Sequence, residues 1–391
     1  MLNHSLVTIS LPEGFSSCVT NVGVKDATDD LTIVLANDEA TSAGVFTQSR
    51  FAGPSVEISR AHNTGNVRGV VVISKNANVA NGPQGLADAR EVVRSVAQKL
   101  HIAPEQLFLA STGVIGRLYP MDKIRMGISA LPEQFDSHDA EKVARGIMTT
   151  DTVHKVAEAT VASSTARVVG VAKGVGMIEP NMATLIAMVF TDAKISAEDL
   201  DRSFRSVINR TLNCVSVDTD TSTSDTAIII ASGKADTVDR TAFEEALYSV
   251  LLSLTKQVAR DGEGAETLIE VCVDTAGDYA QAKTVAKSIV NSPLVKTAIH
   301  GADPNWGRVA MAIGKCHDYN DINQDNVVIR FGTQEVYPHQ VDDSGLQALS
   351  AYMRGDEVRI HVSLNIGTHS ATVWGCDLTD GYVRINADYT T

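Results

Sequence analysis

The sequence lacks the features that mark membrane, secreted and nucleic-acid-binding proteins. No apolar run approaches the roughly 18 residues that a membrane-spanning helix needs. The N-terminus has no basic region followed by an apolar stretch, so we expect no signal peptide and no membrane partner. The formal net charge of −14 is opposite in sign to the basic face that phosphate binding requires, so nucleic acid is not an expected partner.

Cysteine is also scarce, with five residues scattered over 391 positions and no Cys-x-x-Cys pair. An odd, scattered set argues against a disulfide framework and against a zinc site. The ten histidines show no metal-ligand spacing, and neither a Walker loop nor a Gly-x-Gly-x-x-Gly after a strand occurs. We therefore expect a cytoplasmic protein that uses no metal and no cofactor.

The composition that remains is that of an ordinary globular protein, with 44% hydrophobic and 20% charged residues. Apolar runs rich in β-branched residues predict strands at 31–36, 43–47, 69–74, 155–161, 167–172, 184–190, 226–231, 268–273, 327–331, 357–364 and 371–374. Helical spacing predicts helices at 86–100, 196–212, 241–259 and 279–290. This alternation predicts an α/β protein of layered sheets and helices, in which a smaller second domain is interwoven with the first.

The most informative segment is 173–190, where a turn rich in glycine and proline leads into an apolar strand. Thr184 lies at the junction. A threonine hydroxyl is a poor nucleophile unless a base accepts its proton. An α-amino group at a chain terminus titrates near pH 8 and could be that base. We therefore hypothesise self-cleavage between Ala183 and Thr184; the alternative is a plain turn that enters a buried strand.

Three other segments combine glycines, hydroxyls and acids. In 111–117, a strand that ends in Thr-Gly could present a hydroxyl and an N–H as an oxyanion hole, or could simply turn. The hydroxyls and acid of 148–152 could bind a substrate or terminate a helix. In 261–265, two glycines could bring the Glu263 carboxylate close to a ligand, or the acid could lie in a solvated loop.

Two further segments are polar without defining a chemistry. The carboxylates of 213–226 are spaced as in a calcium loop, but the loop lacks the EF-hand glycine and terminal glutamate. A hydrogen-bonded loop packed near the site is the favoured interpretation. The stretch 300–308 reads as a dense polar loop without the spacing of a catalytic triad.

Together these segments resemble the ornithine acetyltransferase family along nearly the whole chain. Seven blocks match in the family's order, which makes the resemblance highly specific. They are Ser111–Gly116, Met148–Thr152, Lys173–Thr184, Val217–Thr226, Asp261–Gly264, Ser292–Ala298 and Gly301–Arg308. The resemblance implies the self-processing fold of enzymes with an N-terminal nucleophile.

The resemblance also implies a reaction. The chain would cut itself into residues 1–183 and 184–391, which fold together, and Thr184 would become the nucleophile. It would take the acetyl group from N2-acetyl-L-ornithine, release ornithine and pass the acetyl group to L-glutamate in a ping-pong reaction. The family also forms dimers of the cleaved two-chain unit (α2β2).

Site residues carry over from the family position by position. The Thr112 hydroxyl and the Gly113 N–H match the oxyanion hole. Lys173 suits an amino-acid carboxylate, and Glu263 suits an ammonium group of ornithine. The full set of matching substrate-binding positions is Thr150, Lys173, Thr184, Glu263, Asn386 and Thr391.

One block departs from the family pattern. Residues 76–82 read Asn-Ala-Asn-Val-Ala-Asn-Gly, where many members have Asn-Ala-Asn-Ala-Cys-Thr-Gly. The variant is similar to the branch associated with clavulanic acid gene clusters, so the pathway, the acceptor range and the use of acetyl-CoA stay open. Two other functions also stay open: a self-processing aminopeptidase or amidase, in which water resolves the acyl-enzyme, and a catalytically silent binding protein.

Overall fold

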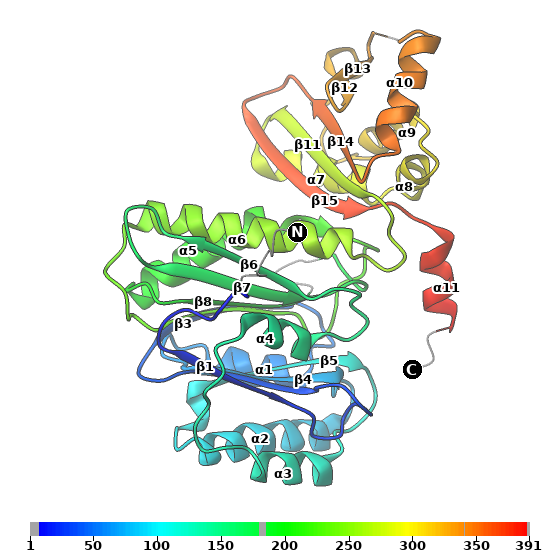
Figure 1. Cartoon of the computed structure of the whole chain (residues 1–391). Coiled ribbons are helices and arrows are strands. Elements are labelled where there is room, and N and C mark those ends of the chain that lie inside the picture. The colour runs from blue at the N-terminus through cyan, green and yellow to red at the C-terminus, as the bar shows by residue number, and fades with distance from the viewer. Residues whose placement is uncertain (1–7, 180–184, 340, 389–391) are drawn as a thin grey trace, which may run out of the picture.

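Three β-sheets with helices between and outside them form the protein, as a computed structural model describes for residues 8–179, 185–339 and 341–388 (Figure 1). The predicted α/β architecture of layered sheets and helices is therefore confirmed. None of the helices in these ranges is both long and apolar enough to cross a bilayer.

The first sheet is buried on both faces, as the continuous apolar run of its central strand predicts. Its strands, in spatial order, are β1 (Phe15–Thr20), β2 (Leu31–Ala36), β4 (Gly69–Asn76) and β5 (Leu107–Val114). β4 and β5 are parallel, and the other pairs are antiparallel. α2 (Gly82–Lys99) and α3 (Met121–Ser129) cover its outer face (Figure 1).

The second sheet lies at the centre of the molecule and determines where the site forms. Its strands, in order, are β3 (Thr41–Phe46), β10 (Thr226–Ala231), β8 (Ile186–Thr191), β7 (Arg167–Lys173) and β6 (Lys155–Thr160). β8 is antiparallel to β7 and parallel to β10. The end of β7 and the starts of β8 and β10 therefore meet at one edge of the sheet.

The inner faces of these two sheets pack on each other through a continuous apolar core. Phe15 meets Phe190 edge to face with the ring centroids 5.3 Å apart, and Phe46 meets Phe108 at 6.1 Å. α1 (Pro54–His62) and α4 (Ala140–Ile147) pack against the same sheets. α5 (Ala197–Arg210) and α6 (Arg240–Arg260) cover the outer face of the second sheet.

The third sheet belongs to a smaller α/β layer formed mostly by the last third of the chain (Figure 1). Its strands, in order, are β13 (Gln334–Tyr337), β12 (Val328–Phe331), β14 (Glu357–Ser363), β11 (Leu268–Ala276), β15 (His369–Cys376) and β9 (Val215–Ser216). Its helices are α7 (Tyr279–Val290), α8 (Pro293–His300), α9 (Trp306–Gly314) and α10 (Asp343–Met353). β9 comes from between α5 and β10, so the two parts are interwoven as expected. The last helix, α11 (Asp380–Asp388), leaves this layer and runs back beside the second sheet (Figure 1).

The four predicted helices are present as α2, α5, α6 and α7, with bounds shifted by a few residues. The Ser196 hydroxyl caps α5 by accepting the Asp199 N–H at 3.2 Å, as expected. The prediction of 300–308 as a loop was wrong in part, because α9 begins at Trp306. α8 and α9 have only eight and nine residues, too few for their apolar spacing to stand out from polar flanks.

The packing of α5 gives a test of the fold. Phe204 is fully buried against the central core, whereas the Arg202 side chain on the same helix is 55% exposed. We predict that Phe204→Ala lowers the free energy of unfolding by about 3–5 kcal/mol, because it leaves a cavity. Arg202→Ala should change it by less than about 0.5 kcal/mol. Urea titration measures both; equal losses would contradict this packing.

Candidate active site

The predicted site residues converge at the strand edge where β7 ends and β8 and β10 begin. A cavity of about 390 Å³ opens there, between the two sheets, the segment after α6 and α11. It is lined by Thr112, Gly113, Thr150, Lys173, Glu263 and Asn386, together with residues of the 174–177 and 222–225 segments. Six predicted residues from five separate places in the sequence therefore share one cavity.

Thr112 and Gly113 are the end of β5, directly beside β4. Gly113 has a φ of +128°, a conformation that glycine adopts without strain. A Cβ atom at this position would lie 2.1 Å from the carbonyl carbon of Lys75. Only glycine lets the backbone pass β4 this closely and continue along the cavity wall beside the Thr112 hydroxyl.

Lys173 ends β7 and carries its ammonium group into the polar wall of the cavity. The residue is only 8% exposed, its Nζ lies 3.4 Å from Thr112 Oγ1, and it lies 3.9 Å from Asp151 Oδ2. Burial lowers the pKa of Lys173, and the negative charge of Asp151 opposes this effect. The site thus holds one cation with a nearby counter-ion but with capacity for a further anionic ligand.

Glu263 faces the same cavity from the loop after α6. Its backbone N–H donates to the Val175 carbonyl at 2.8 Å, which fixes the loop against the turn after β7. The carboxylate accepts from Asn386 Nδ2 at 2.9 Å and from Thr150 Oγ1 at 3.5 Å. A Cβ atom at Gly176 would lie 2.5 Å from the Glu263 carboxylate, so that glycine makes room for it.

A buried cluster of charges lies behind these residues and was not predicted from the sequence. Lys155, fully buried on β6, has its Nζ 2.8 Å from Asp151 Oδ1 and 2.5 Å from Asp261 Oδ2. Burial opposes ionisation of Asp151, but Lys173 and Lys155 outweigh it and hold the pKa of Asp151 at about 2. The sequence block 148–152 pointed to Asp151, but nothing in the sequence distinguished Lys155 from an ordinary strand lysine.

Asp225, directly before β10, lies in the 213–226 segment, to which sequence reasoning gave carboxylates but no individual role for this acid. It is 1% exposed, and its Oδ2 has no hydrogen-bond partner among the residues that the structure describes. Burial raises the pKa of Asp225 well above its usual range, although hydrogen bonds from Ser222 and Thr47 and the charge of Lys173 act in the opposite direction. The wall of the cavity therefore includes a buried carboxyl group whose ionisation is disfavoured by its surroundings.

The 213–226 segment lies beside the site and is hydrogen-bonded as predicted, but it is a loop only from 217 to 225, because Val215–Ser216 form β9 and β10 begins at Thr226. Asp218 accepts from the backbone N–H groups of Met177 and Ile178, each at 2.7 Å. The Glu179 N–H donates to the Asp220 carbonyl at 2.9 Å. These bonds tie the loop to the turn after β7, so its first carboxylate is a structural acceptor.

Three predicted positions, Ala183, Thr184 and Thr391, lie outside the described residues. The family-like block 292–298 forms α8, where Lys296 is buried and donates to the carbonyls of Val217 and Cys376. This lysine joins α8 to the third sheet and does not reach the cavity.

One group in the described part of the chain has the geometry of metal ligands: Glu266, His300 and Asp377. His300 Nδ1 lies 3.2 Å from Asp377 Oδ2. The other oxygen of Asp377 already accepts the N–H groups of Glu266 and Thr267, each at 2.9 Å. The group lies outside the cavity, and its hydrogen bonds connect the start of β11 to the end of β15.

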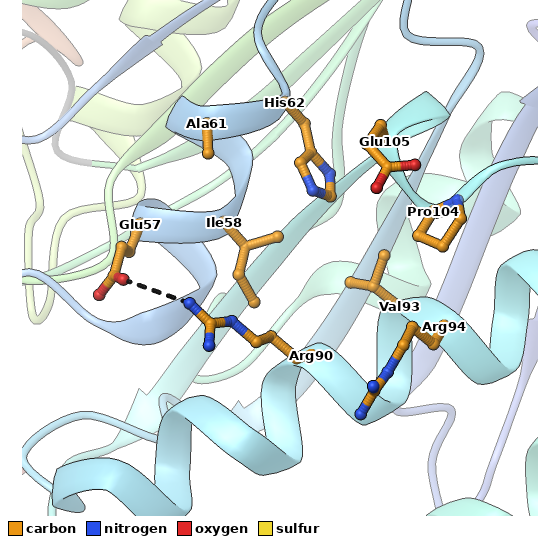
Figure 2. A pocket seen from close by; sticks show the side chains of 9 residues that line it. All are labelled: Glu57, Ile58, Ala61, His62, Arg90, Val93, Arg94, Pro104 and Glu105. Atoms are coloured by element: carbon orange, nitrogen blue, oxygen red, sulfur yellow. Dashed lines mark ion pairs between the residues drawn. The ribbon is translucent and has the colours of Figure 1, made fainter.

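A separate cavity of about 310 Å³ lies between α1 and α2 (Figure 2). Glu57 and Arg90 face each other across it at 4.0 Å, and both side chains are more than half exposed. Such an exposed ion pair contributes little to the stability of the fold. None of the predicted site residues lines this cavity, so the 390 Å³ cavity is the candidate active site.

The fold and the cavity indicate the class of protein to which the chain belongs. A confined polar cavity with one lysine, one glutamate and a Thr-Gly strand end belongs to an enzyme that acts on a small charged substrate.

Comparison with known proteins identifies the family. The ArgJ family model matches residues 16–391. The chain is 57% identical to arginine biosynthesis bifunctional protein ArgJ 2 of Nostoc sp., over 99% of this chain and 100% of that protein. It is 52% identical to glutamate N-acetyltransferase Oat2 of Streptomyces clavuligerus, over 98% and 99% of the two chains. The chain therefore belongs to the ArgJ family, and it is an acyltransferase.

A solved relative is arginine biosynthesis bifunctional protein argJ from Bacillus halodurans. It is 42% identical, covers 51% of this chain and 96% of its own, and has a TM-score of 0.48.

The raised pKa of Asp225 gives a prediction for stability. An acid whose pKa is raised on folding contributes stability below its unfolded pKa of about 3.9 and loses it as the pH rises toward the folded value. Asp225→Asn removes this loss. We predict that its urea midpoint exceeds that of the wild type by an amount that grows from pH 4 to pH 8.

Asp356→Asn, at a side chain that is 86% exposed, is the matched control for this measurement. A midpoint for Asp225→Asn that is equal to or below that of the wild type at pH 8 would contradict the raised pKa of this buried carboxyl group.

Proposed function

We propose that the protein is a self-cleaving acetyltransferase that moves the acetyl group of N2-acetyl-L-ornithine to L-glutamate through an acetyl-Thr184 intermediate. The observation that carries this proposal is that Lys173, Glu263 and the Thr112–Gly113 strand end line one cavity of about 390 Å³. Membership of the ArgJ family supports the same reaction class.

Charge explains how the cavity would select its substrates. Acetylornithine has a carboxylate and a side-chain ammonium group, which match the ammonium group of Lys173 and the carboxylate of Glu263. Asn386 and Thr150, which hydrogen-bond to Glu263, would orient it and contact the substrate. We assign Thr391 to the same substrate-binding set from the family pattern alone.

In the first half-reaction the Thr184 oxygen attacks the acetyl carbon, and the free α-amino group of Thr184 takes the hydroxyl proton. The bond from the acetyl carbon to nitrogen then breaks, the proton passes to that nitrogen, and ornithine leaves. In the second half-reaction the neutral amine of glutamate attacks the ester, and its proton returns to the Thr184 oxygen as N-acetylglutamate leaves.

The tetrahedral intermediate of each half-reaction carries a negative oxygen. The Thr112 hydroxyl and the Gly113 N–H would donate to this oxygen. The Lys173 ammonium group donates a hydrogen bond to Thr112 Oγ1 at 3.4 Å. The hydroxyl proton of Thr112 is thereby left free to point elsewhere, and we propose that it points to the oxyanion.

Self-cleavage would divide the chain into residues 1–183 and 184–391. β7 would end in the first fragment and β8 would begin the second. These strands are antiparallel neighbours with a register that runs from Val168 opposite Thr191 to Lys173 opposite Ile186. Their hydrogen bonds support the proposal that the two fragments stay together as one folded unit.

The proposal also includes a dimer of the cleaved two-chain unit and a cytoplasmic location. α11 has no buried residue, and Val383 and Ile385 on it are 62% and 42% exposed. This apolar exposure fits burial in a dimer of the two-chain unit, which light scattering would test. The five cysteines are free thiols, which fits a reducing cytoplasm.

Loss of the nucleophile tests the cleavage. We predict that Thr184→Ala gives a single intact chain without transferase activity, because both steps need the hydroxyl. Thr241→Ala, at an exposed threonine of α6, is the matched control and should give two fragments. Intact-mass spectrometry decides; two fragments from Thr184→Ala would contradict the proposal.

Loss of the oxyanion donor tests Thr112. We predict that Thr112→Ala lowers the transfer rate by about 10²–10³-fold, as removal of such a donor does. Circular dichroism should show an unchanged fold. A rate within a few-fold of the wild type would remove Thr112 from the mechanism.

The acceptor distinguishes transfer from hydrolysis. The enzyme is incubated with acetylornithine, with and without glutamate, and ornithine and acetylglutamate are measured. We predict that ornithine release depends on glutamate and that acetylglutamate accumulates. Release at the same rate without glutamate, and no acetylglutamate, would favour the amidase instead.

A further inference from the structure

The buried charges behind the cavity connect three segments that each carry a cavity residue. Asp151 follows Thr150, and its Oδ1 accepts the Gly174 N–H at 2.7 Å, next to Lys173. Asp261 lies two residues before Glu263, and its Oδ2 accepts the Thr152 N–H at 3.2 Å. Lys155 lies between the two acids, with its Nζ 2.8 Å from one and 2.5 Å from the other.

The charges of this cluster balance only when all members are counted. Asp151 and Asp261 supply two negative charges, and Lys155 and Lys173 supply two positive charges. Among the described residues, Asp151 is the one acid that forms an ion pair with Lys173, at 3.9 Å, so this acid serves two lysines. Without Asp261, the two lysines would share one counter-ion in a place where burial already penalises charge.

Other charged groups face Lys173 from every neighbouring element. Glu263, on the loop after α6, and Asp225, directly before β10, favour its charged form. Lys25 disfavours it from the segment between β1 and β2, where its Nζ donates to the Met148 carbonyl at 2.8 Å. Among these groups, Asp151 and Lys155 have the largest charge effects on Lys173, and Asp261 pairs directly with Lys155.

We propose that Asp261 is a positioning residue for substrate binding: by neutralising Lys155, it keeps the neighbouring Lys173 ammonium charged and ready to bind a carboxylate. Asp261 touches neither the cavity nor the substrate and acts only through Lys155 and Lys173. This inference rests on the proposed function, because it assigns to Lys173 the binding of an amino-acid carboxylate.

The proposal makes the KM of the donor depend on pH in a defined way. Lys173 binds a carboxylate only while it is protonated, so KM rises as the pH approaches the lowered pKa of this lysine. Loss of Asp261 leaves Lys155 and Lys173 to share Asp151 as their counter-ion, so the charge of Lys155 is less well compensated and moves the Lys173 pKa further down. The rise in KM must then begin at a lower pH.

The first test is Asp261→Asn, which keeps the shape of the side chain and removes its charge. We predict a KM-versus-pH curve for acetylornithine that is displaced down by about one pH unit, so that KM exceeds that of the wild type by up to about tenfold where the curve rises. kcat at saturation should stay within about threefold. Asp201→Asn, which breaks an exposed 2.8 Å pair with Arg205 on α5, is the matched control.

The second test is the double variant Lys155→Met/Asp261→Asn. It removes one positive and one negative charge, so that Asp151 and Lys173 remain as a simple pair. Replacing a buried ion pair by uncharged side chains of similar size is often tolerated. We predict that KM and its pH curve return to within about threefold of the wild type, although two residues have changed.

The outcomes separate this inference from the proposed function. If the wild type and Asp201→Asn transfer no acetyl group, the proposed function fails. If they are active but the KM curve of Asp261→Asn is unmoved, the inference fails. It also fails if the double variant, folded by circular dichroism, keeps a displaced curve or a tenfold higher KM. If Asp261→Asn does not fold, the curve of the double variant alone decides.

Discussion

The arrangement of β8 between an antiparallel β7 and a parallel β10 is the constraint on which the rest of the site depends. It brings the end of one strand and the starts of two others to the same edge of the central sheet. β5 of the facing sheet ends at that edge too, so the Thr-Gly pair and Lys173 line the same cavity. The same arrangement explains why a cut between β7 and β8 would leave the fold intact.

The site combines this geometry with an unusual density of buried charge. Lys155 is fully buried with two aspartates, and the Lys173 ammonium lies beside one of them. A buried charge is tolerated only when a partner compensates it, and removal of one partner exposes the full desolvation cost. The cluster therefore links the stability of the fold to the charge that the cavity presents to a ligand.

Much of this architecture could be predicted from sequence, because its signals are local. Ser196 and the apolar face around Phe204 defined α5, and continuous apolar runs defined β4 and β10. Short helices such as α8 and α9 could not be predicted, because eight or nine residues give too little apolar spacing.

The same distinction holds for the candidate site: local motifs predicted some of its residues, and tertiary packing alone determines the others. Thr112, Lys173 and Glu263 lie in motifs dense in glycine and polar residues, and these motifs marked them. Lys155 contacts Asp261, which is 106 positions away in the sequence, and this contact arises only from tertiary packing. The burial of Asp225 has the same origin. Neither residue differs from an ordinary strand lysine or loop acid until the sheets assemble.

The central claim is that Thr184, freed as a chain terminus, carries the acetyl group. The most direct measurement is the mass of the purified protein under denaturing conditions, before and after brief exposure to acetylornithine without glutamate. The account predicts two fragments, of residues 1–183 and 184–391, with one acetyl group added to the second and lost again when glutamate is supplied. A single uncut chain, or an acetyl group that appears on the first fragment, would contradict it.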